Sequence, residues 1–404
     1  MRGITMAEVA GTPQLRKLKQ AVVLLGAALL SACAVVPRDV GPPPPPPPTT
    51  TAPRPTTPRP VTPALPEDAA RHRIALLVPL SGANAAVGRS LANATQLALL
   101  DTRNEKVRIT NYDTSTGAAA AAQRAIDEGA QLILGPLLAE DVRIVTPIAR
   151  AARVPVLSFS NDVSVAGNGA YLLGYAPAQS IERVVDYARG TGITDFAGLV
   201  PAGTYGERAS TAFLRAVEGA GGHVTGMQTY DRSAGSIANA VGRLTRASPF
   251  QAVLIADSAG TASLAVPALK RSAGGARVLG TELWNADTGI GGNAALNGAW
   301  FASVSNTLYR QYAGKYRARF GAAPYRLSSL GYDAVLLTVR IARDWRVGDR
   351  FPESRLTDRD GFAGLDGAFR FGRDGIAERA LEVQEIRSGT TVTVSPAPAG
   401  FGER

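Results

Sequence analysis

The chain has 404 residues, a formal net charge of +10, one cysteine and two histidines. A single cysteine excludes a disulfide within the chain. So few cysteine and histidine side chains leave almost no ligands for a metal centre and no Cys/His catalytic pair. We therefore expect neither a metal nor a cofactor.

Residues 1–32 are predicted to be an export signal. A basic stretch at residues 16–19 precedes an uncharged apolar run at residues 21–32, which is the pattern of a signal peptide. The run is shorter than the ~20 apolar residues of a membrane-spanning helix. It ends in Leu-Ser-Ala-Cys, which resembles the lipobox of bacterial lipoproteins. The resemblance implies that Cys33 is lipidated, and Ala34 after it favours the outer membrane. The alternative is an ordinary signal peptide with a chance cysteine.

Residues 33–70 are predicted to be a lipidated cysteine followed by a proline-rich tether. Residues 37–66 contain 14 prolines in 30 positions, a composition that cannot form a packed core. Proline-rich chain adopts an extended helix that rises ~3.1 Å per residue, so residues 34–70 would reach roughly 115 Å. We expect a spacer between the membrane and a folded domain. A binding site for a proline-recognising partner at residues 42–48 is the alternative.

The remaining chain alternates apolar strand patterns with helical patterns. Strands of 5–7 residues separated by amphipathic helices indicate βαβ units and a parallel sheet. We expect four strands in a first lobe and four in a second, at residues 74–80, 106–113, 131–135, 154–162, 195–201, 222–230, 251–257 and 276–282.

The regular alternation of strand and helix patterns ends after residue 283. A short strand, two helices and a terminal strand pair are expected there. We assign residues 71–176 to lobe 1, with about 300–345. Residues 177–299 go to lobe 2, with about 346–390, and residues 391–404 are expected to be a flexible tail. The chain would then cross between the lobes near residues 174–177, 283–300 and 344–362.

Five segments in this order resemble the type I periplasmic-binding-protein fold of the leucine/isoleucine/valine-binding class: IALLVPLSG, GAQLILGPL, VPVLSFSND, VPAGTYGERASTAF and FAGLDGAFRF. The resemblance implies an α/β fold with two doubly wound lobes and a three-segment hinge. Together with the anchor and tether, the segments are similar to those of penicillin-binding-protein activators, which are outer-membrane lipoproteins. The helical-repeat domain that precedes this domain in some activators is replaced here by the proline-rich segment.

Ligands of open α/β lobes bind at the carboxyl ends of the strands. The loops there supply the candidate cleft residues Ser81, Leu138, Ser160, Asp162, Tyr205, Asp257 and Glu282.

The resemblance to amino-acid-binding relatives implies that Ser160 and Asp162 hold a ligand carboxylate. It implies that Tyr205, Asp257 and Glu282 hold the ammonium group. A carboxylate at position 162 fits an anion badly, because two unpaired carboxylates repel each other. The alternative for residues 160–162 is a capped turn, and for residues 205–207 it is ordinary helix N-terminal chemistry.

The sequence carries no G-x-S-x-G turn and no histidine beside a serine, so we expect no catalysis and no catalytic residues. The basic charge of an exported chain suits an anionic wall polymer, a membrane surface or an acidic protein patch rather than nucleic acid. We expect a lipoprotein on the periplasmic face of the outer membrane that binds and stimulates a bifunctional penicillin-binding protein. The alternative is a receptor for amino acids or short wall peptides that feeds an ABC transporter.

Overall fold

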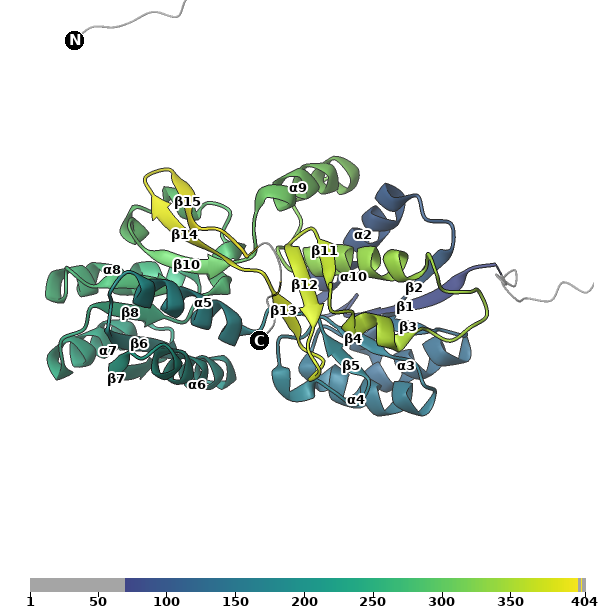
Figure 1. Cartoon of the computed structure of the whole chain (residues 1–404), viewed down its shortest axis with the longest axis horizontal. Coiled ribbons are helices and arrows are strands. Elements are labelled where there is room, and N and C mark those ends of the chain that lie inside the picture. The colour runs from purple at the N-terminus through teal and green to yellow at the C-terminus, as the bar shows by residue number, and fades with distance from the viewer. Residues whose placement is uncertain (1–69, 399–400, 402–404) are drawn as a thin grey trace, which may run out of the picture. The chain divides into compact units, whose positions relative to one another are not determined.

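The computed structural model describes residues 70–398 and residue 401. The predicted signal peptide, Cys33 and the proline-rich tether therefore lie outside the described residues. The fold from residue 70 onward contains two lobes, each built on its own sheet (Figure 1).

The first lobe is built on a five-stranded parallel sheet of order β2-β1-β3-β4-β5. Its strands are β1 (His72–Val78), β2 (Val107–Asp113), β3 (Leu132–Leu134), β4 (Val156–Ser158) and β5 (Ala170–Leu172). Its helices are α2 (Ala85–Thr102), α3 (Ala118–Asp127), α4 (Ala139–Ala151), α9 (Thr307–Phe320) and α10 (Ser328–Ile341). Successive side chains of a strand point to opposite faces of a sheet. Accordingly, Ile74 and Leu76 pack towards α2 and α10, while Ala75 and Leu77 pack towards α3 and α4.

The second lobe is built on a seven-stranded mixed sheet of order β15-β14-β10-β9-β8-β6-β7. Its strands are β6 (Asp195–Pro201), β7 (His223–Tyr230), β8 (Ala252–Ile255), β9 (Arg277–Gly280), β10 (Trp300–Ser303), β14 (Glu382–Arg387) and β15 (Thr390–Ser395). Helices α5 (Pro177–Gly190) and α6 (Thr204–Gly219) cover one face, and α7 (Ala234–Ala247) and α8 (Ala259–Ser272) cover the other. Strands β14 and β15 are antiparallel additions to an otherwise parallel sheet.

A glycine near the start of the helix that follows the first strand has the same role in both lobes. A Cβ atom on Gly88 of α2 would lie 1.7 Å from the carbonyl oxygen of Pro79, and one on Gly206 of α6 would lie 1.7 Å from that of Pro201. Only glycine permits this approach of the helix to the end of the preceding strand. In each lobe, the Val-Pro segment at the end of the first strand and the glycine in the following helix thus set how closely that helix approaches the strand.

A third sheet corrects the predicted boundaries. Strands β11 (Phe362–Gly364), β12 (Gly367–Phe371) and β13 (Ala377–Arg379) form a small antiparallel sheet that packs with lobe 1, because the side chains of Phe362, Phe369 and Phe371 belong to the lobe 1 core. Assigning residues 346–390 to lobe 2 was therefore wrong for this part. Residues 372–376 separate β12 from β13.

The positions at which the chain crosses between the lobes therefore differ in part from the predicted ones. The first lies between β5 and α5, as predicted. The second follows β10, which belongs to lobe 2 because it pairs with β9 and β14. The third lies between β13 and β14. Residues 391–395 were expected in a flexible tail, but they belong to β15 (Thr390–Ser395), which pairs with β14.

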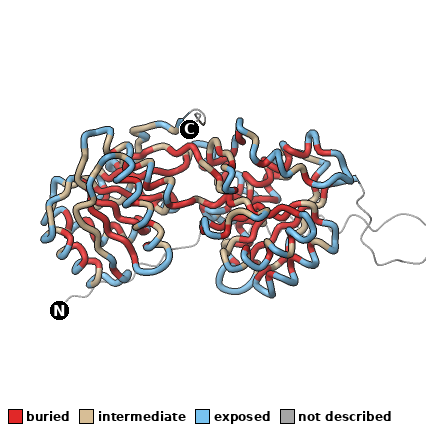
Figure 2. The backbone as a smooth tube through the Cα atoms, turned by 60° about the horizontal axis from the view of Figure 1, so that its bottom comes forward, coloured by how far each residue is buried: buried red, intermediate tan, exposed pale blue. Residues whose placement is uncertain are grey.

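Buried strands occupy the centre of each lobe, and exposed loops and helix faces surround them (Figure 2). Six short 3-10 helices lie in the connections, at Thr114–Thr116, Val163–Val165, Glu282–Ala286, Ile290–Gly292, Ala294–Leu296 and Glu353–Thr357. The α/β class and the two lobes predicted from the sequence are confirmed. Within the described part of the chain, no helix is both long enough and apolar enough to cross a bilayer.

Candidate functional site

A cavity of about 430 Å³ lies between the two lobes. Lobe 1 contributes side chains from the loops after β1, β3, β4 and β5, from the residues before α10 and from β13. Lobe 2 contributes α5, the Glu282–Ala286 turn and the end of β10. Cavities of this size are typical of small-molecule sites.

The structure places two of the seven predicted cleft residues on this cavity. Leu138 and Glu282 line it, whereas Ser81, Ser160, Asp162, Tyr205 and Asp257 do not. Ser81 is exposed and bonds instead to Asp113 at the end of β2, with its Oγ 2.7 Å from Oδ2.

The loop after β4 is satisfied by its own hydrogen bonds. Ser160 is buried, and its Oγ accepts a hydrogen bond from the backbone N–H of Asp162 at 3.1 Å. Asp162 in turn accepts one from the N–H of Ser164 at 3.0 Å. This is the capped turn that the sequence left open as an alternative to a carboxylate site.

Asp162 also joins the two lobes. Its Oδ2 lies 2.7 Å from Nη2 of Arg208, which belongs to α6 of lobe 2, and 3.0 Å from Nη2 of Arg143 in α4 of lobe 1. Burial alone would raise the pKa of Asp162, but the hydrogen bonds from Ser164 and Arg208 outweigh it and lower the pKa to about 2. The carboxylate is therefore ionised at neutral pH and already holds two cations.

Tyr205 stands behind Glu282 rather than on the cavity wall. Its hydroxyl donates to Oε1 of Glu282 at 3.0 Å, and Ser180 of α5 contacts the other carboxyl oxygen. Burial raises the pKa of Glu282 above its ordinary value, in spite of these hydrogen bonds. Burial makes the charged form of such a carboxyl group less favourable, which weakens it as a partner for a ligand ammonium group.

Asp257 is committed to a different set of contacts within lobe 2. Its carboxylate receives Nε of Arg232 at 2.9 Å, the hydroxyl of Tyr230 at 3.2 Å and the backbone N–H of Ser258 at 2.8 Å. Asp257 lies between β8 and Ser258, the residue that caps α8. The structure therefore gives Asp257 a local structural role.

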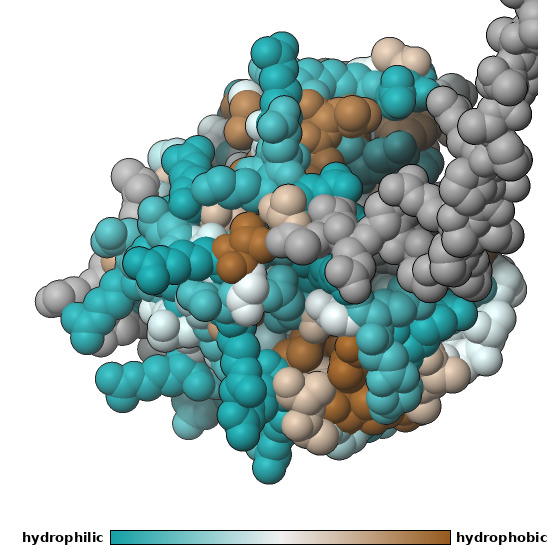
Figure 3. Space-filling model, turned by 90° about the vertical axis from the view of Figure 1, so that its right-hand side faces the viewer, coloured by the Kyte–Doolittle hydropathy of each residue, from teal (hydrophilic) through white to brown (hydrophobic). Residues whose placement is uncertain are grey.

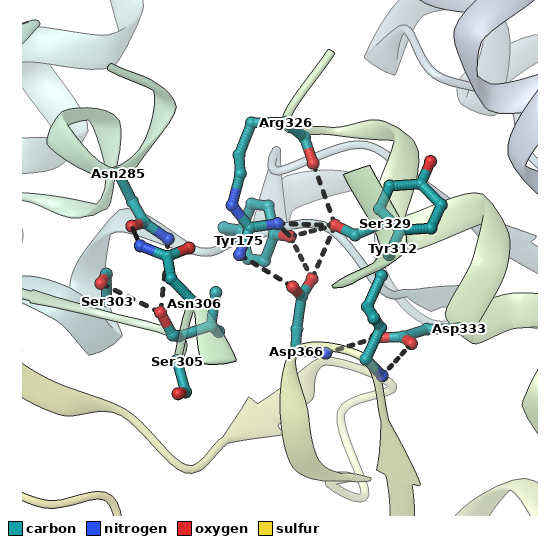
Figure 4. Close-up of polar contacts among 12 residues, drawn as sticks. Tyr175, Asn285, Ser303, Ser305, Asn306, Tyr312, Arg326, Ser329, Asp333 and Asp366 are labelled. Carbon is teal, nitrogen blue, oxygen red and sulfur yellow. Dashed lines mark hydrogen bonds and ion pairs between the residues drawn. The ribbon is translucent and has the colours of Figure 1, made fainter. Parts of the chain in front are cut away.

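A buried ionic cluster that no sequence pattern predicted lies at the lobe 1 wall of the cavity. Nη2 of Arg326 lies 2.8 Å from Oδ1 of Asp366, and Ser329 donates to Oδ2 at 2.7 Å. The hydroxyl of Tyr175 also contacts this carboxylate (Figure 4). Nη2 of Arg379 donates to the carbonyl oxygen of Leu173 at 2.6 Å. These residues come from the first crossing, the start of α10, the β11–β12 turn and β13.

Two carboxyl groups of this cluster have opposite pKa shifts. Burial acts to raise the pKa of Asp366, but Arg326 and Arg379 outweigh it and lower the pKa. Burial and the nearby charge of Asp366 raise the pKa of Asp333, which accepts the backbone N–H of Leu365. Asp366 is therefore the ionised partner of the arginines, whereas the pKa of Asp333 is held above its ordinary value.

A larger depression of about 740 Å³ lies along α5 and α6. Small side chains such as Ala212 and Ala216 line it, together with charged residues that include Glu207 and Arg208. It contains none of the seven predicted cleft residues.

A metal site needs a cluster of side chains that bind the metal ion. Residues 70–398 hold no group of three or more histidine, cysteine, aspartate or glutamate side chains that could share an ion.

A model of the periplasmic binding protein family matches residues 72–391. The chain belongs to this family. The match spans both lobes and all three crossings between them. It agrees with the type I fold expected from the sequence, and it places the protein among binding proteins of the bacterial envelope.

Solved structures at low sequence identity share the fold. A branched-chain amino acid ABC transporter protein from Rhodospirillum rubrum is 21% identical with a TM-score of 0.70, over 80% of this chain and 100% of that one. The leucine-binding protein LivK of Thermotoga maritima is 20% identical with a TM-score of 0.61, over 81% and 99%. Full-length LpoA of Haemophilus influenzae is 19% identical with a TM-score of 0.62, over 80% of this chain and 59% of that one.

One curated relative is an uncharacterized protein of Rickettsia prowazekii, which is 29% identical over 139 residues. The alignment covers 34% of this chain and 37% of that protein. The matched part is thus well under half of either protein.

Proposed function

We propose that this protein is a non-catalytic lipoprotein of the outer membrane that binds and stimulates a bifunctional penicillin-binding protein. The observation that carries the proposal is the state of the loop after β4. Residues 160–162, where the resemblance implies a ligand carboxylate, are satisfied by their own hydrogen bonds and by the ion pair from Asp162 to Arg208 of the other lobe. A receptor must open and close its lobes around a ligand, and this ion pair opposes opening.

The predicted anchor and tether support the same proposal. A domain held to the outer membrane through Cys33 by a tether that reaches roughly 115 Å can cross a cell wall to a synthase. A solute carrier gains nothing from attachment to the membrane that lacks its transporter. The similarity to activators and to LpoA of Haemophilus influenzae favours an interaction domain as well.

A capture experiment tests the proposal. The full-length protein, immobilised in detergent, is exposed to solubilised envelope, and the eluate is treated with a fluorescent penicillin. We expect a labelled bifunctional synthase to be retained above the level seen with an unrelated lipoprotein, and its glycan-strand synthesis to rise when the protein is added. Absence of a retained labelled band would contradict the proposal.

The alternative of a solute receptor is favoured by a different observation, which is the cavity between the lobes. The cavity retains a volume of about 430 Å³ with apolar walls and a few buried polar groups, as ligand sites do. Binding of a small molecule without synthase capture would support the receptor. The two functions are compatible if the ligand tunes the contact with a synthase.

A further inference from the structure

Helix α9 carries basic side chains and no acidic ones. Its sequence, TLYRQYAGKYRARF, contains no aspartate or glutamate, and its four basic residues are all exposed: Arg310, Lys315, Arg317 and Arg319. Lys315 pairs with Asp101 of α2, with its Nζ 2.9 Å from Oδ2. Among the residues that the structure describes, Arg317 and Arg319 have no ion pair and no side-chain hydrogen bond. The fold therefore leaves much of this positive charge unmatched.

The inner face of α9 is fixed to lobe 1 by packing. Tyr309, Tyr312 and Tyr316 are buried in one cluster with Ala94 and Leu97 of α2. Hydrogen bonds also reach this face, because α2 and the start of α10 both bond to the tyrosine hydroxyls. Helix α9 thus lies beside α2 (Figure 1) and presents its outer face from a fixed position.

The outer face of α9 is a row of small residues between two basic rows. Successive residues of an α-helix are turned by about 100°, so Gly314 and Ala318 lie opposite the buried tyrosines. Arg317 lies on one side of this pair and Arg319 on the other. By the same spacing, Arg310 belongs to the row of Arg317, and Lys315 belongs to the row of Arg319.

The packing of the domain does not require the glycine in this row. A Cβ atom at Gly314 would meet no atom within 4 Å, and Gly314 lies inside a regular helix, where glycine is a poor choice. A glycine on an exposed helix face does allow another backbone to approach closely. A helix docked on α9 would use that approach.

Exposed apolar side chains lie beside the basic rows. Leu308 in the first turn of α9 is 47% exposed, and Tyr325 after the helix is 48% exposed. The backbone N–H of Tyr325 and the hydroxyl of Tyr316 both donate to Oγ of Ser90, which places residue 325 near α9. Arginine together with aromatic side chains is typical of protein interfaces, whereas a lipid surface attracts a basic segment by its charge. The combination favours a protein partner with an acidic face.

We propose that the outer face of α9 is a docking surface for an acidic helix of a protein partner. The docked helix lies along Gly314 and Ala318, and its carboxylates meet the arginine and lysine side chains of both rows. The inference deepens the proposed function and rests on it for the identity of the partner, the penicillin-binding synthase. The surface itself is defined by charge and shape, so it can also be tested without a synthase.

Two matched charge reversals in the full-length protein locate the surface. The α9 variant, Arg317→Glu with Arg319→Glu, reverses two exposed charges in the last turn of α9. The control variant, Arg246→Glu with Arg271→Glu, reverses two exposed charges in the last turns of α7 and α8. In the capture experiment at low salt we expect the α9 variant to retain about tenfold less labelled synthase than the control variant. Equal retention would overturn the inference and leave the proposed function intact.

A substitution in the small-residue row separates docking from folding. Gly314→Gln places a good helix former in open space, so we expect the midpoint of thermal unfolding to stay the same or rise. Its added bulk should nevertheless lower synthase retention about fivefold, because it blocks the close approach of a helix. Full retention by this variant would contradict the proposed docking geometry.

A synthetic helix tests the surface without a synthase. The probe is a fluorescein-labelled peptide of about 20 residues of glutamate, alanine and leucine, and the same peptide with lysine in place of glutamate is its control. Fluorescence anisotropy should show that the wild type and the control variant bind the glutamate peptide and that the α9 variant does not. Equal peptide binding by the two variants, or none by the wild type, would overturn the inference.

The failures of the two proposals are distinguishable. If the wild type captures no synthase, the proposed function fails, and the peptide measurement alone decides whether α9 docks an acidic helix. Sedimentation with purified wall sacculi and with vesicles of about 30% phosphatidylglycerol covers the other anionic partners. An α9 variant that loses only sacculus or vesicle binding would make the partner a polymer or a lipid surface, and the inference would be wrong.

Discussion

At the scale of single residues, burial decides which charged side chains are already paired within the fold and which could still contact a ligand. Asp162 and Asp257 were both candidate cleft residues, because each follows a strand of a parallel sheet. In the structure both are buried and already hold arginine side chains. Arg326 and Arg379 gave no such signal in the sequence, yet both are buried at the wall of the cavity, where Arg326 is paired with Asp366.

The ion pair between Asp162 and Arg208 makes a first prediction. In a double-mutant cycle of Asp162→Asn and Arg208→Gln, we expect a coupling free energy of about 1 kcal/mol in urea unfolding. The Asp344–Arg355 pair is the control, because its side chains are 73% and 52% exposed, so its coupling should be smaller. Equal coupling in the two pairs would show that the contact between lobes has no special weight.

Acid should remove the contribution of Asp162. A pKa lowered from 3.8 to about 2 in the folded protein stabilises the fold above pH 3.8, and this stabilisation is lost as the pH falls towards 2. The Asp162→Asn variant should therefore lose less stability than the wild type between pH 4 and pH 2. Thermal unfolding across this pH range provides the measurement.

The pKa shift of Asp333 predicts a pH dependence of stability with the opposite sign. Its pKa is raised above 3.8 in the folded protein, so the folded state holds the proton more tightly than the unfolded state does. Its contribution to stability therefore falls as the pH rises from about 4 towards its folded pKa. In Asp333→Asn we expect a flatter dependence of stability on pH in this interval. An unchanged slope would mean that Asp333 is ionised throughout.

At the scale of elements, the third sheet belongs to lobe 1 because of its aromatic side chains. Phe369 is fully buried, and its ring centroid lies 5.6 Å from that of Phe362 and 6.1 Å from that of Phe371. The same sheet carries Asp366 in its first turn and Arg379 in its last strand. Packing of these aromatic rings therefore also sets the position of the ionic cluster.

Truncation of this aromatic cluster should be costly. We expect Phe369→Ala to lower the free energy of unfolding by about 3–5 kcal/mol, because it removes a large buried side chain and leaves a cavity. Leu264→Ala on α8 is the control, since Leu264 is 56% exposed, and it should change stability by less than about 0.5 kcal/mol. Similar effects of the two substitutions in chemical denaturation would contradict the packing assigned to the third sheet.

At the scale of the whole molecule, exposed large apolar side chains of the described residues are scattered over several elements. On the face of the molecule in Figure 3, hydrophilic side chains predominate and the apolar ones form separate small areas. Exposed large apolar side chains, such as Leu100 on α2 and Leu264 on α8, lie on different elements. The proposed function therefore depends on the predicted lipid anchor and on the length of the tether as much as on any one surface.

The anchor and the tether can be tested separately. We expect Cys33→Ser to move the protein from the membrane fraction to the soluble periplasmic fraction, because no acyl chain is added. Deletion of residues 42–60 should leave the protein in the membrane fraction and leave its synthase capture in detergent unchanged, but it should abolish stimulation in cells. Stimulation by the shortened protein equal to that of the wild type would argue against a spacer role.

The sequence alone determined the α/β class, the eight main parallel strands and the division into two lobes. These features depend on local hydrophobic periodicity, which can be read within one segment. The tertiary structure alone decided where the chain makes its second and third crossings between the lobes. Short strands such as β10 and β11 belong to one lobe or the other through the strands that they pair with, and their own residues do not reveal those partners. It also decided the site. Tyr175, Arg326, Asp366 and Arg379 are separated by up to 204 positions, yet they form one cluster of hydrogen bonds, ring contacts and charges. Whether a charged side chain is satisfied or available depends on neighbours that only folding brings together.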